Sequence, residues 1–124
     1  MQIRGISDKR KSFMFSNDKT FSESEINSVW LKGRTVPGYD SDKCRKDVAG
    51  AWMIRSSYGV LSEFGWQIDH IKPSSRGGDD TLSNLQPLQH DNNLSKSDDY
   101  PTWISAKTAN GDHNVTYHQR ITQQ

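Results

Sequence analysis

Residues 65–99 read GWQIDHIKPSSRGGDDTLSNLQPLQHDNNLSKSDD, and this stretch decides the fold. Apolar and polar side chains alternate from Trp66 to Ile71, which is the period of a β-strand, and Pro73 ends that strand. A run of turn-forming residues follows, SSRGGDD, in which two glycines permit positive backbone φ angles. We therefore expect a strand followed by a tightly punctuated polar loop.

A second strand and a helix follow the loop. Residues 83–88 predict a short strand that returns beside the first, with Pro87 tolerated at an edge or a strand end. Asp91 predicts the N-cap of a helix from residue 92 to about residue 97. The resulting ββα unit indicates an α+β fold, a small single domain with added helices and strands.

The stretch contains the pattern D-H-I-x-P-x-S-x-G-G, then N-L-x-x-L, then N-x-x-K-S-D. This pattern resembles that of the HNH family of endonucleases, whose core is a ββα-metal unit. The resemblance is strongest over residues 50–99. The positions that agree in type and spacing are Asp69, His70, Ile71, Pro73, Ser75, Gly77, Gly78, Asn84, Leu85, Leu88, Asn93, Lys96 and Ser97.

The resemblance implies a metal-dependent endonuclease that hydrolyses phosphodiester bonds in DNA. His70 would be the general base, because an imidazole with a pKa of about 6.5 is basic yet neutral at working pH. Asp69 and Asn93 would hold the metal ion. Asn84 would act on catalysis indirectly, since its amide would bind the loop backbone near His70 and orient the imidazole.

The donor set favours one kind of metal. Asp69 and Asn93 both offer oxygen, which suits Mg²⁺ or Mn²⁺ better than Zn²⁺. A site with two protein ligands is adequate for Mg²⁺, because that ion keeps several waters. Cys44 is the only cysteine, so the paired CxxC motifs that brace many HNH proteins are missing and no structural zinc is expected.

Three cations are candidates for binding substrate phosphates. Lys72 and Arg76 flank the loop where a nucleic-acid backbone would pass. Lys96 lies one helical turn from Asn93 and either reaches a phosphate oxygen or is a solvated helix charge; the sequence favours neither alternative over the other.

Other polar residues of the stretch have plainer interpretations. Asn93 could simply cap the helix, although the ligand role is favoured. Asp79 and Asp80 resemble a second metal site, but their position after two glycines favours turn residues. His90 is assigned no metal role, because Asn93 already fills the position that the family uses.

The remainder of the chain divides into three segments. Residues 1–20 carry five Lys or Arg against two Asp, so they are either a basic arm on nucleic acid or a solvated terminus. Residues 21–104 form the nuclease domain, with its ββα core at residues 65–98. Residues 105–124 form a polar extension with a possible edge strand.

Further elements are predicted outside the ββα core. Ser22 and Glu25 form a capping box that predicts a helix over residues 23–32, with an apolar face of Ile26, Val29 and Trp30. We also expect a short helix over residues 41–49, a strand over 51–54, a turn over 108–113 and a weak strand over 114–121. Trp52, Trp66 and Trp103 are expected in the core.

Charge limits how the protein can bind DNA. Residues 49–100 carry four Lys or Arg against seven acids, a net charge of −3. Binding must therefore rely on the metal, the few placed cations, the basic arm and tail residues such as Lys107, His113, His118 and Arg120. We expect weak, salt-sensitive binding of low sequence specificity, with specificity supplied by substrate shape, a homodimer or a larger nucleoprotein partner.

No apolar run approaches the roughly 20 residues that span a bilayer, and no signal peptide is recognisable, so a cytoplasmic protein without membrane contact is expected. Two other functions remain open from sequence. One is a catalytically silent nucleic-acid-binding or assembly module with the same fold. The other is a toxin-like nuclease. The sequence does not distinguish DNA from RNA, or nicking from double-strand cleavage.

Overall fold

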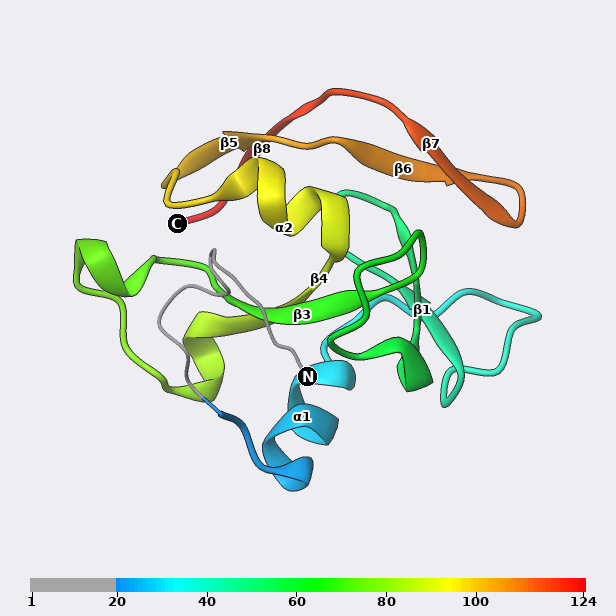
Figure 1. The fold of residues 1–124 in the computed structure, drawn as a ribbon, viewed down its shortest axis with the longest axis horizontal. Helices are drawn as coiled ribbons and strands as arrows, with labels where there is room; N and C mark the ends of the chain where they lie inside the picture. Colours follow the sequence, from blue (N-terminus) through cyan, green and yellow to red (C-terminus); the bar gives the residue numbers. More distant parts are fainter. Residues whose placement is uncertain (1–19) are drawn as a thin grey trace.

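The structure is a computed structural model and describes residues 20–124. Within this range there are two α-helices, and the strands pair as antiparallel two-stranded sheets (Figure 1). The basic arm expected at residues 1–20 lies almost wholly outside the described residues. The helices are α1 (Glu23–Trp30) and α2 (His90–Lys96), and the strand pairs are β1 (Cys44–Lys46) with β2 (Trp52–Ile54), β3 (Trp66–His70) with β4 (Leu85–Gln89), β5 (Thr102–Ile104) with β8 (Arg120–Thr122), and β6 (Lys107–Asn110) with β7 (His113–Thr116).

The β3–β4 hairpin is the centre of the molecule, with α1 on one side and α2 on the other (Figure 1). Its register pairs Trp66 with Gln89 and His70 with Leu85. The hairpin and α2 follow each other directly, so the ββα unit predicted from the sequence is present. The α+β fold class is confirmed.

The packing of α1 against the hairpin forms the larger apolar core. Trp30 and Trp66 lie with their ring centroids 5.1 Å apart, and both are almost fully buried. Burying a large apolar side chain contributes roughly 1.5–3 kcal/mol, so these contacts fix α1 on β3–β4. The buried members of this core are Ile26, Val29, Trp30, Met53, Trp66 and Leu85.

The start of α1 is as predicted, and its end is earlier. Ser22 accepts a hydrogen bond from the Glu25 backbone, and the Glu25 side chain accepts one from the Ser22 backbone, which completes the capping box. The helix ends at Trp30, because the chain then turns through Gly33, whose backbone approaches Arg45 too closely for an easy Cβ.

The opposite side of the hairpin is covered by α2 and the strands that follow it. Leu88 and Trp103 are fully buried there together with Ala49, so the prediction that Trp103 covers the core is confirmed. The Asn92 side chain accepts hydrogen bonds from the backbone N–H groups of Ala106 and Lys107. This side chain ties α2 to the C-terminal strands.

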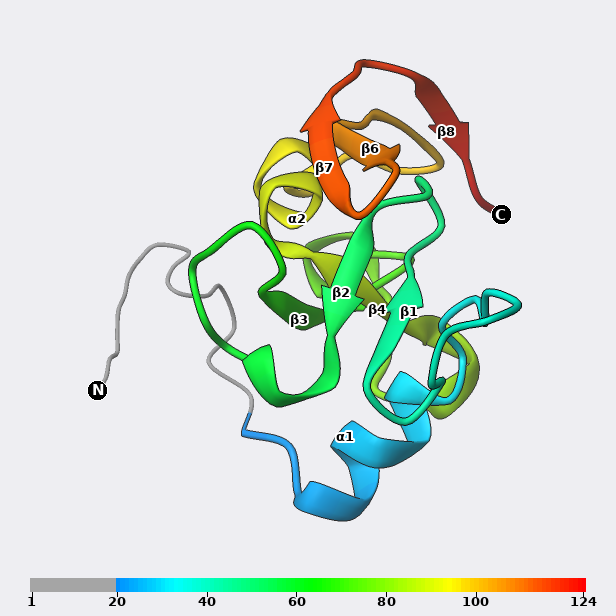
Figure 2. The same ribbon diagram turned by 90° about the vertical axis from the view of Figure 1, so that its right-hand side faces the viewer.

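Two local predictions are wrong. Residues 41–49 form no helix; β1 lies there instead and pairs with β2, and the β1–β2 hairpin stands beside β3–β4 and above α1 (Figure 2). The Asp91 N-cap is also wrong, because α2 already begins at His90. Gln89 takes the cap position, and its side chain accepts a hydrogen bond from the Asn92 N–H.

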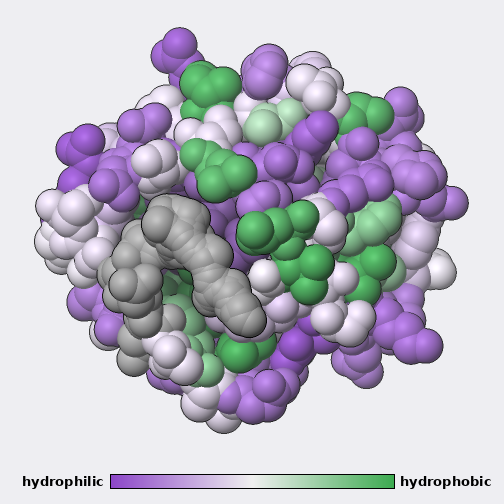
Figure 3. Space-filling view, in the orientation of Figure 1, coloured by the Kyte–Doolittle hydropathy of each residue, from purple (hydrophilic) through white to green (hydrophobic). Residues whose placement is uncertain are grey.

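The C-terminal region is more strand-rich than expected. The predicted turn is confined to the tip of the β6–β7 hairpin, where Gly111 has φ +63°. The weak strand predicted over residues 114–121 is divided between β7 and β8. Within residues 20–124 no helix is long and apolar enough to cross a bilayer. On the face drawn in Figure 3, apolar side chains form scattered patches among polar ones, as is usual for protein surfaces.

Candidate active site

His70 is the last residue of β3, at the point where the strand passes into the loop over residues 71–84. Its side chain is 10% exposed, and Nε2 lies 2.7 Å from Asp80 Oδ1. An ionised carboxylate only accepts hydrogen bonds, so this contact favours the tautomer with the proton on Nε2. The other ring nitrogen, Nδ1, then carries the free lone pair.

Asn84 closes the loop beside His70. Its Oδ1 accepts a hydrogen bond from the Lys72 N–H at 2.9 Å, and its Nδ2 donates to the carbonyls of Lys72 and Asp79 at 3.0 and 2.9 Å. Its own backbone carbonyl accepts from the Ile71 N–H. Asn84 therefore joins both ends of the loop that carries Asp80 to His70.

Two glycines let this loop fold tightly. Gly77 has φ +93°, a left-handed conformation that favours glycine. A Cβ on Gly78 would lie 1.7 Å from the Lys72 carbonyl oxygen and 2.9 Å from Asn84 Nδ2. The close approach of the chain at Gly78 is thus a condition for the hydrogen bonds of Asn84.

Asp69 points to the opposite face of β3 from His70, as neighbouring residues of a strand do. Its carboxylate accepts hydrogen bonds from Gln86 Nε2 at 3.0 Å and pairs with Lys96 Nζ at 3.3 Å. Burial raises the pKa of the Asp69 carboxyl, and the Lys96 ammonium opposes that rise. The Asp69 carboxylate is therefore almost buried and is held by the donors of Gln86 and Lys96.

The position of Lys96 corrects the expectation that it binds a substrate phosphate. Its side chain is 1% exposed, and Nζ is directed at Asp69 and at the His70 carbonyl oxygen, 2.9 Å away. In this arrangement the ammonium cannot meet a phosphate in solvent. The solvated-charge alternative is equally wrong, because Lys96 is an internal cation.

The other two predicted phosphate ligands are exposed. Lys72 projects from the start of the loop, and only its backbone is used by Asn84. Arg76 Nε donates to the Asp98 carbonyl at 2.8 Å, which ties the loop to the segment after α2. Both side chains lie on the loop that follows His70.

Asn93 lies on the face of α2 that meets β3. Its Nδ2 donates to Gln67 Oε1 at 3.2 Å, and Gln67 shares a strand face with Asp69. Gln67 Nε2 is buried without a partner among the described residues. A buried amide without a partner is unusual, and it leaves one donor of Gln67 unused beside Asn93.

Asp69 and Asn93 have the donor atoms that a divalent ion needs, but in this structure the Asp69 carboxylate is paired with Lys96. Asp69 and Asn93 offer hard oxygen donors from facing elements, as Mg²⁺ requires. The Asp69 carboxylate, however, is held by Lys96, so the ammonium has to move before a metal ion can bind there. Over residues 20–124 no group of three or more His, Cys, Asp or Glu side chains could hold a metal ion.

Sequence reasoning underestimated Asp80 and missed Gln86. Asp79 is a turn residue as expected, since it accepts hydrogen bonds from the Thr81 N–H and hydroxyl, which lower the pKa of its carboxyl. Asp80, its neighbour, instead reaches His70. Gln86 could have been noted, because it follows Asn84 by two residues and so falls opposite Asp69 in an antiparallel hairpin.

Comparison with known proteins agrees with this geometry. Residues 59–102 match the family model described as HNH endonuclease, and the match includes all of β3, β4 and α2. No curated protein and no solved structure gives a significant match to the chain. The ββα unit with its Asp-His pair, loop asparagine and helix asparagine lies wholly within the matched segment. Over this segment the chain is similar to the HNH endonuclease family.

Proposed function

We propose that the protein is a divalent-metal-dependent endonuclease that hydrolyses phosphodiester bonds in DNA. The observation that carries this proposal is the fixed position of His70, which is held at Nε2 by Asp80 beside the loop that Asn84 closes. The family match supports a nuclease. DNA as substrate and Mg²⁺ as cofactor are parts of the proposal.

In the proposed reaction, His70 Nδ1 takes a proton from a water molecule, whose oxygen attacks phosphorus in line with the departing 3′ oxygen. The new bond joins water oxygen to phosphorus, the P–O3′ bond breaks, and the departing 3′ oxygen takes a proton from a solvent water, so the products carry a 5′ phosphate and a 3′ hydroxyl. A divalent ion held by Asp69 and Asn93 would stabilise the charge on the scissile phosphate. Lys72 and Arg76 would orient the backbone next to His70.

The test is cleavage of supercoiled plasmid at low salt in Mg²⁺, Mn²⁺, Zn²⁺ or EDTA. Wild type should nick or linearise the plasmid in Mg²⁺ or Mn²⁺, and His70→Ala should reduce the rate by about 10²–10⁴ without changing the melting temperature. His90→Ala is the matched control, because this half-buried histidine begins α2 and is assigned no metal role. Equal activity of His70→Ala and wild type would remove His70 from the mechanism.

One observation favours a second candidate, a silent nucleic-acid-binding or assembly module with the same fold. The Asp69 carboxylate is already neutralised by Lys96, as it would be in a site that no longer needs a metal ion. This candidate predicts that neither wild type nor any single variant cuts plasmid in any metal. The protein would still bind the same DNA in a titration.

A further inference from the structure

An open pocket lies on the side of the molecule formed by the end of α1, β1 and β4. Its volume is about 190 Å³. Small-molecule sites usually measure about 300–1,000 Å³, so the size favours a small group over a nucleotide base or an organic ligand. The residues that line it are Lys32, Gly33, Arg34, Lys46, Asp47, Val48, Ile71, Gln86 and Pro87.

Three of the lining residues are cations, and the backbone holds two of them rigidly. Arg34 and Lys46 exchange backbone hydrogen bonds of 2.8 and 2.9 Å, so their side chains leave neighbouring chain segments. Arg34 Nη2 donates to the Val48 carbonyl at 2.8 Å, and Lys46 Nζ lies 4.8 Å from the centre of the Trp52 ring. Each cation keeps further N–H donors for an anion.

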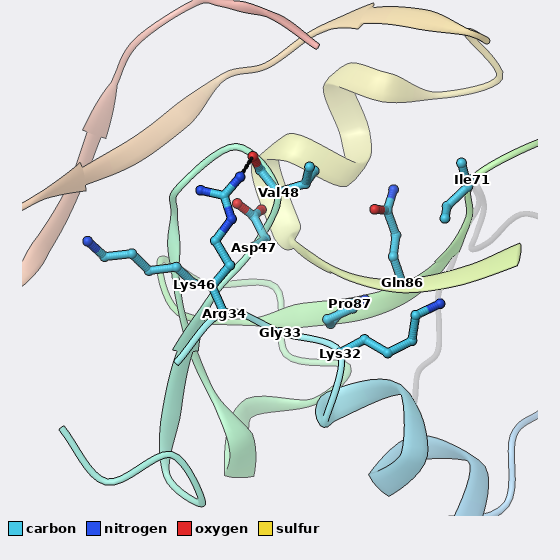
Figure 4. Close-up of a pocket in the computed structure, with 9 residues that line it drawn as sticks. All are labelled: Lys32, Gly33, Arg34, Lys46, Asp47, Val48, Ile71, Gln86 and Pro87. Atoms are coloured by element: carbon cyan, nitrogen blue, oxygen red, sulfur yellow. Dashed lines mark hydrogen bonds between the residues drawn. The ribbon is translucent and has the colours of Figure 1, made fainter. Parts of the chain in front are cut away.

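The third cation stands at the other end of the pocket. Figure 4 shows Lys32 on the side of Gln86 and Ile71, with Arg34 and Lys46 across the pocket beside Asp47. Lys32 Nζ donates to the carbonyls of Leu82 and Leu85, which joins the end of α1 to the start of β4. The Lys32 ammonium is therefore directed away from Arg34 and Lys46 (Figure 4).

Asp47 is the only acid among the described residues that line the pocket, and its carboxylate is directed inward. The residue is 1% exposed. Its carboxylate accepts hydrogen bonds from the N–H groups of Ala49, Ala51 and Gln89 and from Asn92 Nδ2, at 2.9 to 3.0 Å. Four donors offset the negative charge, so the pocket presents a positive field to solvent.

The pocket shares a wall with the candidate active site. Ile71, which lines the pocket, follows Asp69 by two residues and so falls on the same side of the chain as Asp69. Gln86, on the wall, donates its side-chain N–H to Asp69. A polymer with regularly spaced phosphates could therefore contact both places, whereas the segment over residues 49–100 has a net charge of −3 and lacks this attraction.

We propose that this pocket binds a non-scissile phosphate of the nucleic-acid backbone, with Arg34 and Lys46 as its ligands, and so supplies affinity that the ββα unit lacks. The inference rests on the proposed nuclease function, since it names where the substrate is held. Lys and Arg contacts of this kind position a backbone without reading its sequence. The pocket would therefore act on substrate affinity and leave the chemical step unchanged.

The experiment compares Arg34→Gln/Lys46→Gln with the control Lys43→Gln/Arg55→Gln, which removes the same charge from an exposed and a partly exposed cation outside the pocket. Lys32 is left intact because its ammonium links α1 to β4. Binding of labelled duplex DNA is measured by fluorescence anisotropy in EDTA, with equal melting temperatures required of both variants. The pocket variant should bind about tenfold more weakly, and its salt slope should fall by about 0.9 for each phosphate that it no longer neutralises.

Three results would refute the proposed phosphate site. Each can be distinguished from the result expected if the protein has no nuclease activity. Equal weakening by both variants would mean that only total charge matters. If wild type cuts DNA and the pocket variant has the same DNA affinity and the same KM, the nuclease function is supported and the phosphate site is refuted. If inorganic phosphate at constant ionic strength stabilises wild type but not the pocket variant, while DNA binding is equal, the pocket takes a free anion. Weaker DNA binding by the pocket variant, in a protein that never cuts, would support the pocket and reject the nuclease.

Discussion

Lys96 Nζ lies 3.3 Å from Asp69 Oδ2, and the two side chains are only 1% and 9% exposed. The carboxylate proposed to hold a metal ion is therefore paired with an internal cation from α2. A buried ion pair is costly to form and more costly to break on one side only. The pair consequently affects both the stability of the ββα unit and the availability of Asp69.

A double-mutant cycle on this pair should show strong coupling. Lys96→Met and Asp69→Asn should each lower the free energy of unfolding by about 3 kcal/mol, because each leaves one buried polar partner uncompensated. The double variant should lose much less than the sum. Urea denaturation measures all four proteins, and additive losses would show that the pair is not formed in solution.

Stability should also depend on pH through the buried acids. Burial raises the pKa of the Asp47 and Asp69 carboxyls from 3.8, so between that value and the folded-state pKa the folded protein binds more protons than the unfolded chain. The contribution of these groups to the free energy of unfolding therefore falls as pH rises through that window. Urea denaturation from pH 4 to 7 should show a smaller fall in Asp69→Asn/Lys96→Met than in wild type. A steeper fall in the double variant would contradict the assignment.

The two glycines of the loop should respond differently to alanine. Gly77→Ala places a Cβ in open space. It should lower the free energy of unfolding by only about 1–2 kcal/mol, because alanine disfavours the left-handed conformation. Gly78→Ala meets the Lys72 carbonyl at 1.7 Å and must displace the loop that Asn84 closes. Plasmid cleavage should therefore fall much further in Gly78→Ala than in Gly77→Ala, and thermal unfolding of both variants separates lost activity from lost fold. Equal activity of the two would argue against the described loop geometry.

Asp80 should behave as a positioning residue for His70. Asp80→Asn replaces the acceptor at Nε2 with an amide that can donate, which favours the tautomer with the proton on Nδ1. We expect kcat to fall by about tenfold to a hundredfold with KM unchanged, less than the full contribution of a general base. Asp80→Glu should recover part of the loss, and Asp79→Asn should leave kcat near wild type. A change in KM alone would place Asp80 in substrate binding instead.

The sequence predicted those parts of the fold that depend on local pattern. The alternation over residues 66–71, the capping box at Ser22 and the turn residues after Pro73 act over a few residues, and the structure contains β3, α1 and the loop. β1 was missed because it has three residues and is stabilised by pairing with Arg34 and β2, which no local period reveals.

The same limit explains the candidate site. Asp69, His70, Asn84 and Asn93 were identified from the resemblance to the HNH pattern, and the structure places them on β3, directly before β4 and on α2. The burial of Lys96 depends on which strand residue lies across from it, and the contact of Asp80 with His70 depends on the path of the loop. Both contacts depend on the tertiary fold and cannot be predicted from residue spacing.

The C-terminal strands also contribute to the surroundings of Asp69. Gln123 accepts hydrogen bonds from Trp103 Nε1 and Gln86 Nε2 and donates one to Gln86 Oε1, and Gln86 in turn holds Asp69. The ββα unit is complete in sequence at residue 96, yet Gln86 lacks two of its partner atoms until residue 123 has been synthesised. A nascent chain would thus carry every residue of the candidate active site some time before Asp69 acquires its final environment. The order of synthesis would delay full assembly of the site until the C-terminal strands have folded over α2.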